Sequence, residues 1–245
     1  MTAVLVIAGS DPSGGAGLVR DVRTLGQFGV QALCAVTAVT AQSDAAVSAV
    51  HLIPPELVSA QIRAALASRR VAAVKLGMLG TRATVLAVAA SIPPRTAVPL
   101  VLDPVLAASS GAELLDAAGR AALLETLLPR VTLLTPNIPE AAALLGTSRA
   151  RTDEELLRQG QALRALGPEA VLLKGGHASG TDSTDMLFET QGVHRLTAPR
   201  VAATCRGTGC ALAAAIAAGL ALGLELRAAC ARAKQHVLGL LQHHD

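Results

Sequence analysis

Short apolar segments alternate with longer segments of helical periodicity along most of the chain. The apolar segments lack the alternation of strands that face water on one side, so we expect strands buried on both faces. The helical patterns between them predict an α/β fold in which helices cover both faces of a mostly parallel sheet. The predicted strands are residues 4–8, 30–40, 71–76, 97–102, 131–135 and 170–173, and the predicted helices are 16–28, 55–69, 81–90, 113–127, 139–145 and 153–165.

The pattern changes in the last third of the chain. Two apolar runs within residues 186–198 meet at Gly192, which predicts an antiparallel hairpin on the edge of the sheet. Helical patterns then cover 209–222 and 224–241. Because no internal repeat or long linker interrupts the chain, we expect a single domain over residues 1–245.

Composition narrows the possible partners. Hydrophobic residues make up 51% of the chain but aromatic residues only 1%, so Ala, Val, Leu and Ile must fill the core. Stacking of bases on aromatic side chains is therefore nearly excluded, and nucleic acid is not expected as a partner. The formal net charge of +3 is spread along the chain, which fits a soluble protein with one local anion site.

The ends of the chain and its cysteines indicate a location in the cell. The first apolar run has no basic region before it and no cleavage site after it, so we expect no signal peptide. The apolar residues 211–224 fall short of the ~20 that span a bilayer. The four cysteines form no CxxC pair. We therefore expect reduced thiols in a cytoplasmic protein without a membrane segment.

Glycines and polar residues gather directly after the predicted strands. In an open parallel sheet, ligands bind beyond the carboxyl ends of the strands, so these segments predict one ligand-binding rim. In chain order the segments read GSDPSGGAG, TAQ, KLGML, LDPV, TPNIPE and KGGH.

The first segment, residues 9–17, connects a strand to a helix. Its glycines allow close approach of the backbone to an anion or a small ring, but a tight turn alone would also explain them. Gly15 and Ala16 stand where a Walker A loop has Lys and Ser or Thr, and the dinucleotide fingerprint is absent as well.

Carboxylates follow two later strands. Asn137 and Glu140 lie one helical turn apart at a helix start, where they could hold Mg²⁺ water and polyphosphate oxygens or form a capping box. Asp103 precedes Pro104 at a strand end and suits either a turn or the surroundings of a metal ion.

The strongest local signal is the segment Gly207, Thr208, Gly209 and Cys210 at the start of a helix. Successive N–H groups there could surround a phosphoryl oxyanion, and the helix terminus is expected to lower the pKa of the Cys210 thiol. A buried cysteine behind an ordinary helix start is the alternative. The histidines show no spacing that would complete a metal site with Cys205 and Cys210.

Seven motifs in order resemble the hydroxymethylpyrimidine kinase and hydroxymethylpyrimidine phosphate kinase family of thiamine biosynthesis. The resemblance runs from about Val4 to Gly223 and implies a ribokinase-like three-layer αβα sandwich that is dimeric and uses ATP and Mg²⁺. The motifs are IAGSDPSGGAG, TAVTAQ, VKLGML, LDPV, TPNIPEAAALL, LLKGGH and GTGCALAAAIAAGLALG.

The resemblance also implies residue roles. Gln42 is expected to bond the aminopyrimidine edge, because a carboxamide both donates and accepts hydrogen bonds. Cys210 takes the place of the aspartate base of the wider ribokinase family. The residues expected around the ring are Gly9, Ala16, Asp21 and Met78, and those expected to handle ATP phosphates and Mg²⁺ are Asn137, Glu140, Lys174 and the Gly207–Gly209 turn.

The chain departs from the family pattern at several positions. Ser109 replaces the usual Lys and Arg206 the usual His, while Asp44 stands where Thr is common. Arg206 is expected to supply a cation near the phosphates and to favour the Cys210 thiolate. The chain ends at Asp245, before the family's usual tail, which makes the second phosphorylation less secure than the first.

Two other functions fit parts of this pattern. A pyridoxal or pyridoxine kinase on the same fold would share the glycine motifs, although those relatives commonly carry another residue in place of Gln42. A nucleotide- or vitamer-binding relative without turnover would tolerate the changes at Ser109 and Arg206.

Overall fold

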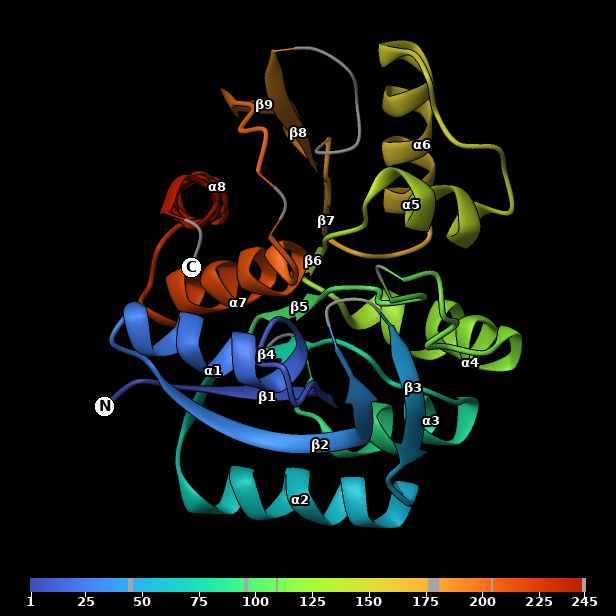
Figure 1. The fold of residues 1–245 in the computed structure, drawn as a ribbon, viewed down its shortest axis with the longest axis vertical. Helices are drawn as coiled ribbons and strands as arrows, with labels where there is room; N and C mark the ends of the chain where they lie inside the picture. The colour runs from blue at the N-terminus through green and yellow to red at the C-terminus, as the bar shows by residue number, and fades with distance from the viewer. Residues whose placement is uncertain (44–45, 95–96, 109, 176–180, 204, 244–245) are drawn as a thin grey trace.

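A computed structural model describes residues 1–43, 46–94, 97–108, 110–175, 181–203 and 205–243. One nine-stranded sheet lies between two layers of helices (Figure 1). The strand order is β3-β2-β1-β4-β5-β6-β7-β8-β9, and the pairs from β2 to β7 are parallel. The strands are β1 Ala3–Ser10, β2 Gln31–Gln42, β3 Val47–Leu52, β4 Val71–Leu76, β5 Leu100–Leu102, β6 Leu133–Leu134, β7 Ala170–Leu173, β8 Asp182–Glu189 and β9 Gly192–Pro199.

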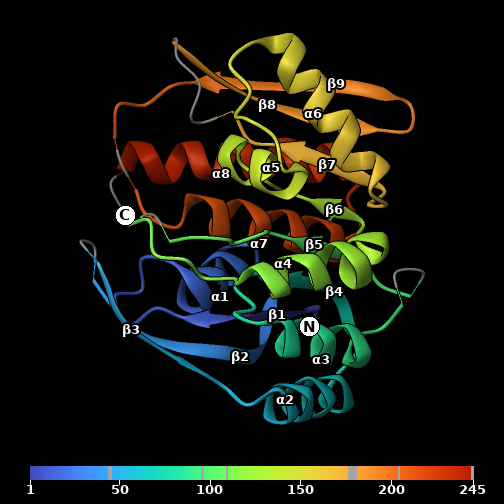
Figure 2. The same cartoon turned by 90° about the vertical axis from the view of Figure 1, so that its right-hand side faces the viewer.

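The helices divide between the two faces of the sheet (Figure 2). On one face lie α1 Gly17–Gln27, α7 Thr208–Ala221 and α8 Leu226–His243. On the other face lie α2 Pro55–Ser68, α3 Arg82–Ser91, α4 Ala117–Ala122 with a π-turn Leu123–Leu127 and a 3₁₀ turn Leu128–Arg130, α5 Ile138–Leu145 and α6 Asp153–Ala165.

Strand β1 shows why the apolar runs lack polar alternation. Leu5 and Ile7 pack into the core under α2 and α3, whereas Val4 and Val6 pack into the core under α1 and α7. Because both faces of the strand are buried, every position favours an apolar side chain. The predicted doubly covered sheet is confirmed.

Three sequence predictions need correction. Strand β3 was missed, because most of its residues are exposed and its segment therefore lacks a buried apolar run. The predicted helix 113–127 begins only at Ala117, since Asp116 caps it by accepting a hydrogen bond from the Gly119 N–H. The strands predicted at 97–102 and 131–135 are shorter in the structure. The edge hairpin is confirmed as β8 and β9.

Helix α7 is built from small residues, and nearly all of its central positions are buried. Gly219 lies against α8, where an added Cβ would be 2.9 Å from the Ala229 Cβ. Such close approach requires glycine, because real Cβ atoms do not come so near to one another.

We expect Gly219→Ala to lower the free energy of unfolding by about 1–3 kcal/mol through overpacking. Gly239→Ala on α8 is the matched control, because nothing lies within 4 Å of its added Cβ. That control should raise the free energy of unfolding by up to about 1 kcal/mol through helix propensity. Urea denaturation measures the free energy of unfolding of both variants. An equal increase in the two variants would contradict the close packing at Gly219.

No helix in the described part of the chain is both long enough and apolar enough to span a membrane. None of the four cysteines, all of which lie in the described ranges, forms a disulfide.

Candidate active site

Three of the segments that follow strands meet at the Lys174 ammonium. Its Nζ lies 2.9 Å from Asp103 Oδ1 and 3.7 Å from Glu140 Oε2. Burial alone would lower the pKa of this amine, but the Asp103 and Glu140 carboxylates outweigh burial and raise it. Lys174 is therefore a fixed positive charge between two carboxylates at the ends of β5, β6 and β7.

The N-terminus of α7 faces the same ammonium. A Cβ added to Gly209 would lie 3.2 Å from Lys174 Nζ and 3.7 Å from Asp103 Oδ2. Thr208 is the first residue of α7, and the first N–H groups of a helix have no partner within it. Lys174 and the α7 terminus thus present positive charge and hydrogen-bond donors to one location.

Asn137 and Glu140 form a capping box, which is one of the two roles that the sequence predicts for them. Asn137 Oδ1 accepts from the Glu140 N–H at 2.8 Å, and Glu140 Oε2 accepts from the Asn137 N–H at 2.7 Å. Burial raises the pKa of the Glu140 carboxyl, and Lys174 opposes this effect. Since Glu140 caps α5 and also faces Lys174, the capping role does not remove it from the site.

The glycine-rich loop after β1 packs against the turn before α7. Gly207 has a positive φ of 69°, and an added Cβ would collide with the Gly15 carbonyl oxygen. The Arg206 guanidinium donates to Ser13 Oγ at 3.2 Å and to Asp11 Oδ2 at 3.3 Å. Arg206 thus joins the two turns, a contact that the sequence pattern did not indicate.

The Cys210 thiol does not have the lowered pKa that its place at a helix start predicts. Burial raises the pKa of this thiol to about 11, while the Lys75 ammonium and a hydrogen bond from the Gly17 N–H oppose the effect only in part. Burial outweighs the lowering effect expected of a helix terminus because the thiolate would lose part of its hydration, although Cys210 keeps some exposed surface. The structure therefore does not support the lowered pKa predicted for the Cys210 thiol.

A pH series of alkylation tests this assignment. We expect labelling of Cys210 by iodoacetamide to speed up about tenfold per pH unit between pH 8 and pH 10, because only the thiolate reacts. Mass spectrometry of the Cys210 peptide measures the rate, with urea-unfolded protein as the control. A plateau in the folded protein below pH 8 would contradict the raised pKa.

A buried ion pair lies behind the thiol. Lys75 Nζ on β4 is 2.7 Å from Asp21 Oδ2 on α1, and neither side chain has any exposed surface. Burial raises the pKa of the Asp21 carboxyl to about 6, although Lys75 opposes this. Among the described residues, Asp21 Oδ1 has no hydrogen-bond partner.

This pair corrects one prediction and adds a residue. With no exposed surface, Asp21 does not line a ring position as predicted; it is the partner of Lys75. Sequence reasoning missed Lys75, although a lysine within the apolar strand VAAVKL was the available signal. A lysine buried on such a strand needs a charged partner.

The other residues predicted around the ring lie near the end of β1. An added Cβ on Gly9 would be 2.8 Å from Met78 Sδ, so the Met78 thioether lies directly on this backbone. Gln42 ends β2, and its Oε1 is 3.3 Å from the Thr40 hydroxyl, which also bonds the Ser10 carbonyl oxygen. Ala16 Cα would lie 2.9 Å from an added Cβ on Gly207. The structure therefore brings Gly9 and Met78 together, places Gln42 next to Thr40 at the end of β2, and sets Ala16 against the α7 turn.

Metal ligands are few at this rim. No group of three or more His, Cys, Asp or Glu side chains comes together in the residues that the structure describes. Asp103 and Glu140 are two carboxylates that share Lys174. Ser109 and Asp44, two of the departures from the family pattern, and His177 of the KGGH segment lie outside the described residues.

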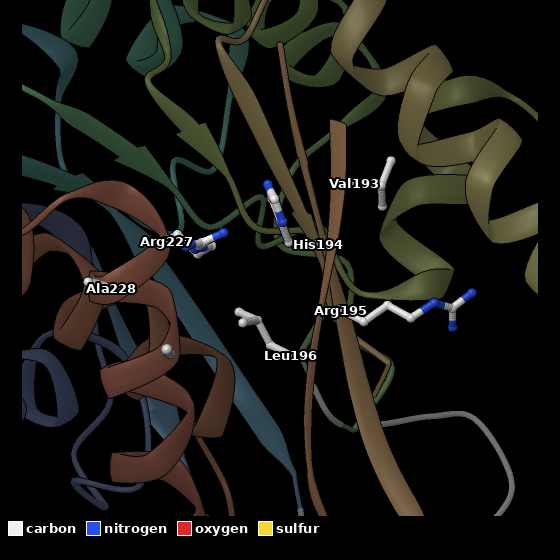
Figure 3. Close-up of a pocket in the computed structure, with 7 residues that line it drawn as sticks. Val193, His194, Arg195, Leu196, Arg227 and Ala228 are labelled. Atoms are coloured by element: carbon white, nitrogen blue, oxygen red, sulfur yellow. The ribbon is translucent and has the colours of Figure 1, made fainter. Parts of the chain in front are cut away.

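A surface pocket elsewhere has a different lining. Figure 3 shows His194, Arg195 and Leu196 on β9 opposite Arg227 on α8. Val193, Ala228 and Ala231 complete the lining, and none of the predicted site residues contributes to it. This pocket is separate from the rim around Lys174 and Cys210.

Comparisons with known proteins identify the family of this chain. The family model described as phosphomethylpyrimidine kinase matches residues 11–245. The hydroxymethylpyrimidine/phosphomethylpyrimidine kinase of Salmonella typhimurium is 45% identical over 214 residues, which cover 87% of this chain and 80% of that protein. A phosphomethylpyrimidine kinase structure from Clostridium difficile aligns with a TM-score of 0.84 at 32% identity, covering 98% of this chain and 99% of that chain.

Pyridoxal kinases share the same architecture. The structure of the Staphylococcus aureus pyridoxal kinase in complex with AMP-PCP aligns with a TM-score of 0.88 at 30% identity, covering 99% of this chain and 88% of that chain. These alignments confirm the predicted ribokinase-like sandwich. With the family match over residues 11–245 and this close relative from Salmonella typhimurium, the chain belongs to the phosphomethylpyrimidine kinase family.

Proposed function

We propose that this protein transfers the γ-phosphoryl group of ATP to 4-amino-5-hydroxymethyl-2-methylpyrimidine or to its monophosphate. The observation that supports this best is the convergence of Lys174, the two carboxylates Asp103 and Glu140, and the α7 terminus. Phosphoryl transfer depends mostly on alignment and on stabilisation of negative charge, and this arrangement offers both.

The phosphate end of the site uses three kinds of donor. Lys174 is proposed to contact the transferring phosphoryl oxygens, and the N–H groups of Thr208, Gly209 and Cys210 to surround them; the nearness of Gly209 to Lys174 at the start of α7 supports this. Arg206 adds charge from the edge of the turn while it holds Asp11 and Ser13. Asn137 fixes the direction of Glu140 through the capping box.

The carboxylates Asp103 and Glu140 fit a Mg²⁺ ion that arrives with the nucleotide. Proteins bind Mg²⁺ through one or two carboxylates together with substrate phosphates, so a larger cluster of ligands is not required. Bound Mg²⁺ would neutralise charge on the phosphates during transfer.

Gln42, Gly9, Ala16 and Met78 are proposed to hold the pyrimidine. The Met78 thioether on the Gly9 backbone offers an apolar surface, and the Gln42 carboxamide at the end of β2 lies 3.3 Å from the Thr40 hydroxyl, which bonds the Ser10 carbonyl oxygen. A carboxamide can pair with both a ring nitrogen and an exocyclic amine.

We expect Gln42→Met to weaken pyrimidine binding by about 1–3 kcal/mol, because polar groups of the ring would lose their partners. Binding of ATP should change little. Gln31→Met is the matched control, since it places the same change at the opposite end of β2. Isothermal titration with each ligand measures both affinities, and equal losses for the two ligands would remove Gln42 from the pyrimidine site.

Cys210 is proposed to take the proton of the hydroxymethyl group. With a thiol pKa of about 11, about one part in ten thousand is thiolate at pH 7. Lys75, whose charge favours the thiolate, is proposed to support the ionised form during transfer. The base therefore contributes at the low end of the usual range for general-base catalysis.

A pyridoxal kinase activity is the second candidate, because the Staphylococcus aureus pyridoxal kinase shares the fold over nearly the whole chain. ADP release should be measured with hydroxymethylpyrimidine, its monophosphate, pyridoxal or no acceptor. We expect the highest kcat/KM with hydroxymethylpyrimidine. A preference for pyridoxal would support the second candidate, and no turnover with any acceptor would support a binding relative.

The cytoplasmic location, the homodimer and the single domain over residues 1–245 stay predictions from the sequence. Light scattering after size exclusion tests the dimer. A mass near twice the 24.7 kDa of one chain is the expected result.

A further inference from the structure

A second buried ion pair lies behind Lys174, in a place that the proposed reaction does not use. Lys234 Nζ on α8 is 2.8 Å from Asp185 Oδ2 on β8. Both residues are buried, with exposed fractions of 8% and 5%. Burying two charges is costly, so a pair that is kept in such a place calls for an explanation beyond stability.

The second oxygen of Asp185 holds the backbone next to Lys174. Asp185 Oδ1 accepts a hydrogen bond from the Gly175 N–H at 2.9 Å. This N–H belongs to the peptide group that follows Lys174. On the other side, the Lys174 N–H donates to the Pro136 carbonyl oxygen at 2.8 Å. The peptide groups on both sides of Lys174 are therefore fixed.

Gly175 leaves this segment little freedom to move. An added Cβ there would collide with the Thr184 carbonyl oxygen, on the residue just before Asp185. The backbone at Gly175 thus lies directly on β8, where the Asp185 carboxylate reaches it. A shift of Asp185 would be transmitted to the peptide that sets the direction of the Lys174 side chain.

We propose that Asp185 and Lys234 are positioning residues for phosphoryl transfer, which orient Lys174 through the Gly175 N–H. Lys234 holds Asp185, Asp185 holds the peptide after Lys174, and Lys174 extends to Asp103 and Glu140. The inference rests on the phosphate-binding role proposed above for Lys174. It connects the last helix of the fold to the phosphate end of the site.

The order of these contacts predicts what each change does. Loss of Lys234 alone leaves the buried Asp185 carboxylate without its cation, which is costly and would change the position of that carboxylate. Replacing both charges with uncharged side chains avoids this problem. Once both charges are removed, the hydrogen-bond acceptor that residue 185 offers to the Gly175 N–H can be varied on its own.

Two double variants form the test. Asp185→Asn with Lys234→Met keeps an oxygen that can accept from the Gly175 N–H, whereas Asp185→Leu with Lys234→Met removes it. Neither variant contains a buried charge at this position, and Asn and Leu share the same branched arrangement of four side-chain heavy atoms. We expect the Leu double variant to have a kcat/KM for ATP about 10- to 100-fold below that of the Asn double variant, because small misplacements of charge are costly in catalysis. The KM for the pyrimidine should agree within about twofold.

Melting temperature and kinetics separate this role from a purely structural one. If the two double variants differ in melting temperature but share the same kcat/KM for ATP, Asp185 and Lys234 only stabilise the fold and the inference is wrong. If Asp185→Leu with Lys234→Met does not fold, Lys234→Met with its partner Asp185 intact takes its place, and an unchanged kcat/KM for ATP would likewise overturn the inference.

The Lys174→Met variant distinguishes this inference from the function on which it rests. A normal kcat/KM for ATP in Lys174→Met would overturn the role of Lys174 itself. A large loss in Lys174→Met with equal activity of the two double variants would overturn only the positioning role. In the Lys174→Met background, the Asn and Leu double variants should no longer differ.

Discussion

Lys174→Met should lower kcat/KM for ATP by about 10²–10³, the largest loss that we expect from any single substitution in this protein. The reason is twofold. The phosphates lose a positive charge that is held in place before the substrate arrives, and Asp103 and Glu140 lose the ammonium that separates them. Because methionine retains much of the length of the lysine side chain, the loss of kcat/KM measures the effect of removing the charge.

Steady-state kinetics with varied ATP measures this effect. Affinity for the pyrimidine, measured by isothermal titration, should change little because the residues proposed to hold the ring are Gln42 and Met78, not Lys174. Lys234→Arg is not a substitute control, since Lys234 itself belongs to the positioning inference. Arg232→Met on α8 is a better control, because Arg232 is exposed and contacts Phe28. A normal kcat/KM for ATP in Lys174→Met would remove this lysine from the phosphate site.

Cys210→Ala should lower kcat by about 10²-fold with little effect on ATP binding, if the thiol takes the hydroxyl proton. The expected loss lies at the low end of the range for general-base catalysis, because burial keeps most of the thiol protonated near neutral pH. By the same reasoning, kcat of the unmodified protein should rise with pH above 7 wherever chemistry limits turnover.

Two further variants make this prediction specific. Cys205→Ala should cost far less, because Cys205 precedes the turn and its thiol contacts Arg20 and the Arg206 carbonyl oxygen. Cys210→Asp should retain more activity than Cys210→Ala and should move the rise of kcat to lower pH, since a carboxylate ionises more readily than this thiol. Full turnover in Cys210→Ala would mean that the thiol only packs the start of α7.

The fold could be predicted from the sequence where burial dictates the residue type. Strand β1 is apolar on both faces because both faces are covered, and this pattern is visible in the sequence. Strand β3 is exposed along most of its length and carries no such pattern. Helix α4 begins at Ala117 because Asp116 caps it. Apolar residues with helical spacing before Asp116 made the predicted helix start too early.

The positions of most site residues near the strand ends could also be predicted, with Asp21 as the exception, but their protonation and their partners could not. Cys210 lies at the α7 start as expected, yet its pKa depends on how tightly the surrounding segments enclose it. Asp21 is paired with Lys75, and Arg206 is paired with Asp11. These contacts join residues that are far apart in the sequence, so spacing within a motif gave no indication of them.

The most direct test of the proposed function is to identify the product. The purified protein, MgATP and hydroxymethylpyrimidine should be incubated together, and the pyrimidine should be analysed by mass spectrometry with Lys174→Met in parallel. We predict that the pyrimidine gains one phosphoryl group in step with ADP release, and that Lys174→Met forms this product far more slowly. ADP release that is the same with and without the pyrimidine, with no phosphorylated pyrimidine formed, would contradict the proposal.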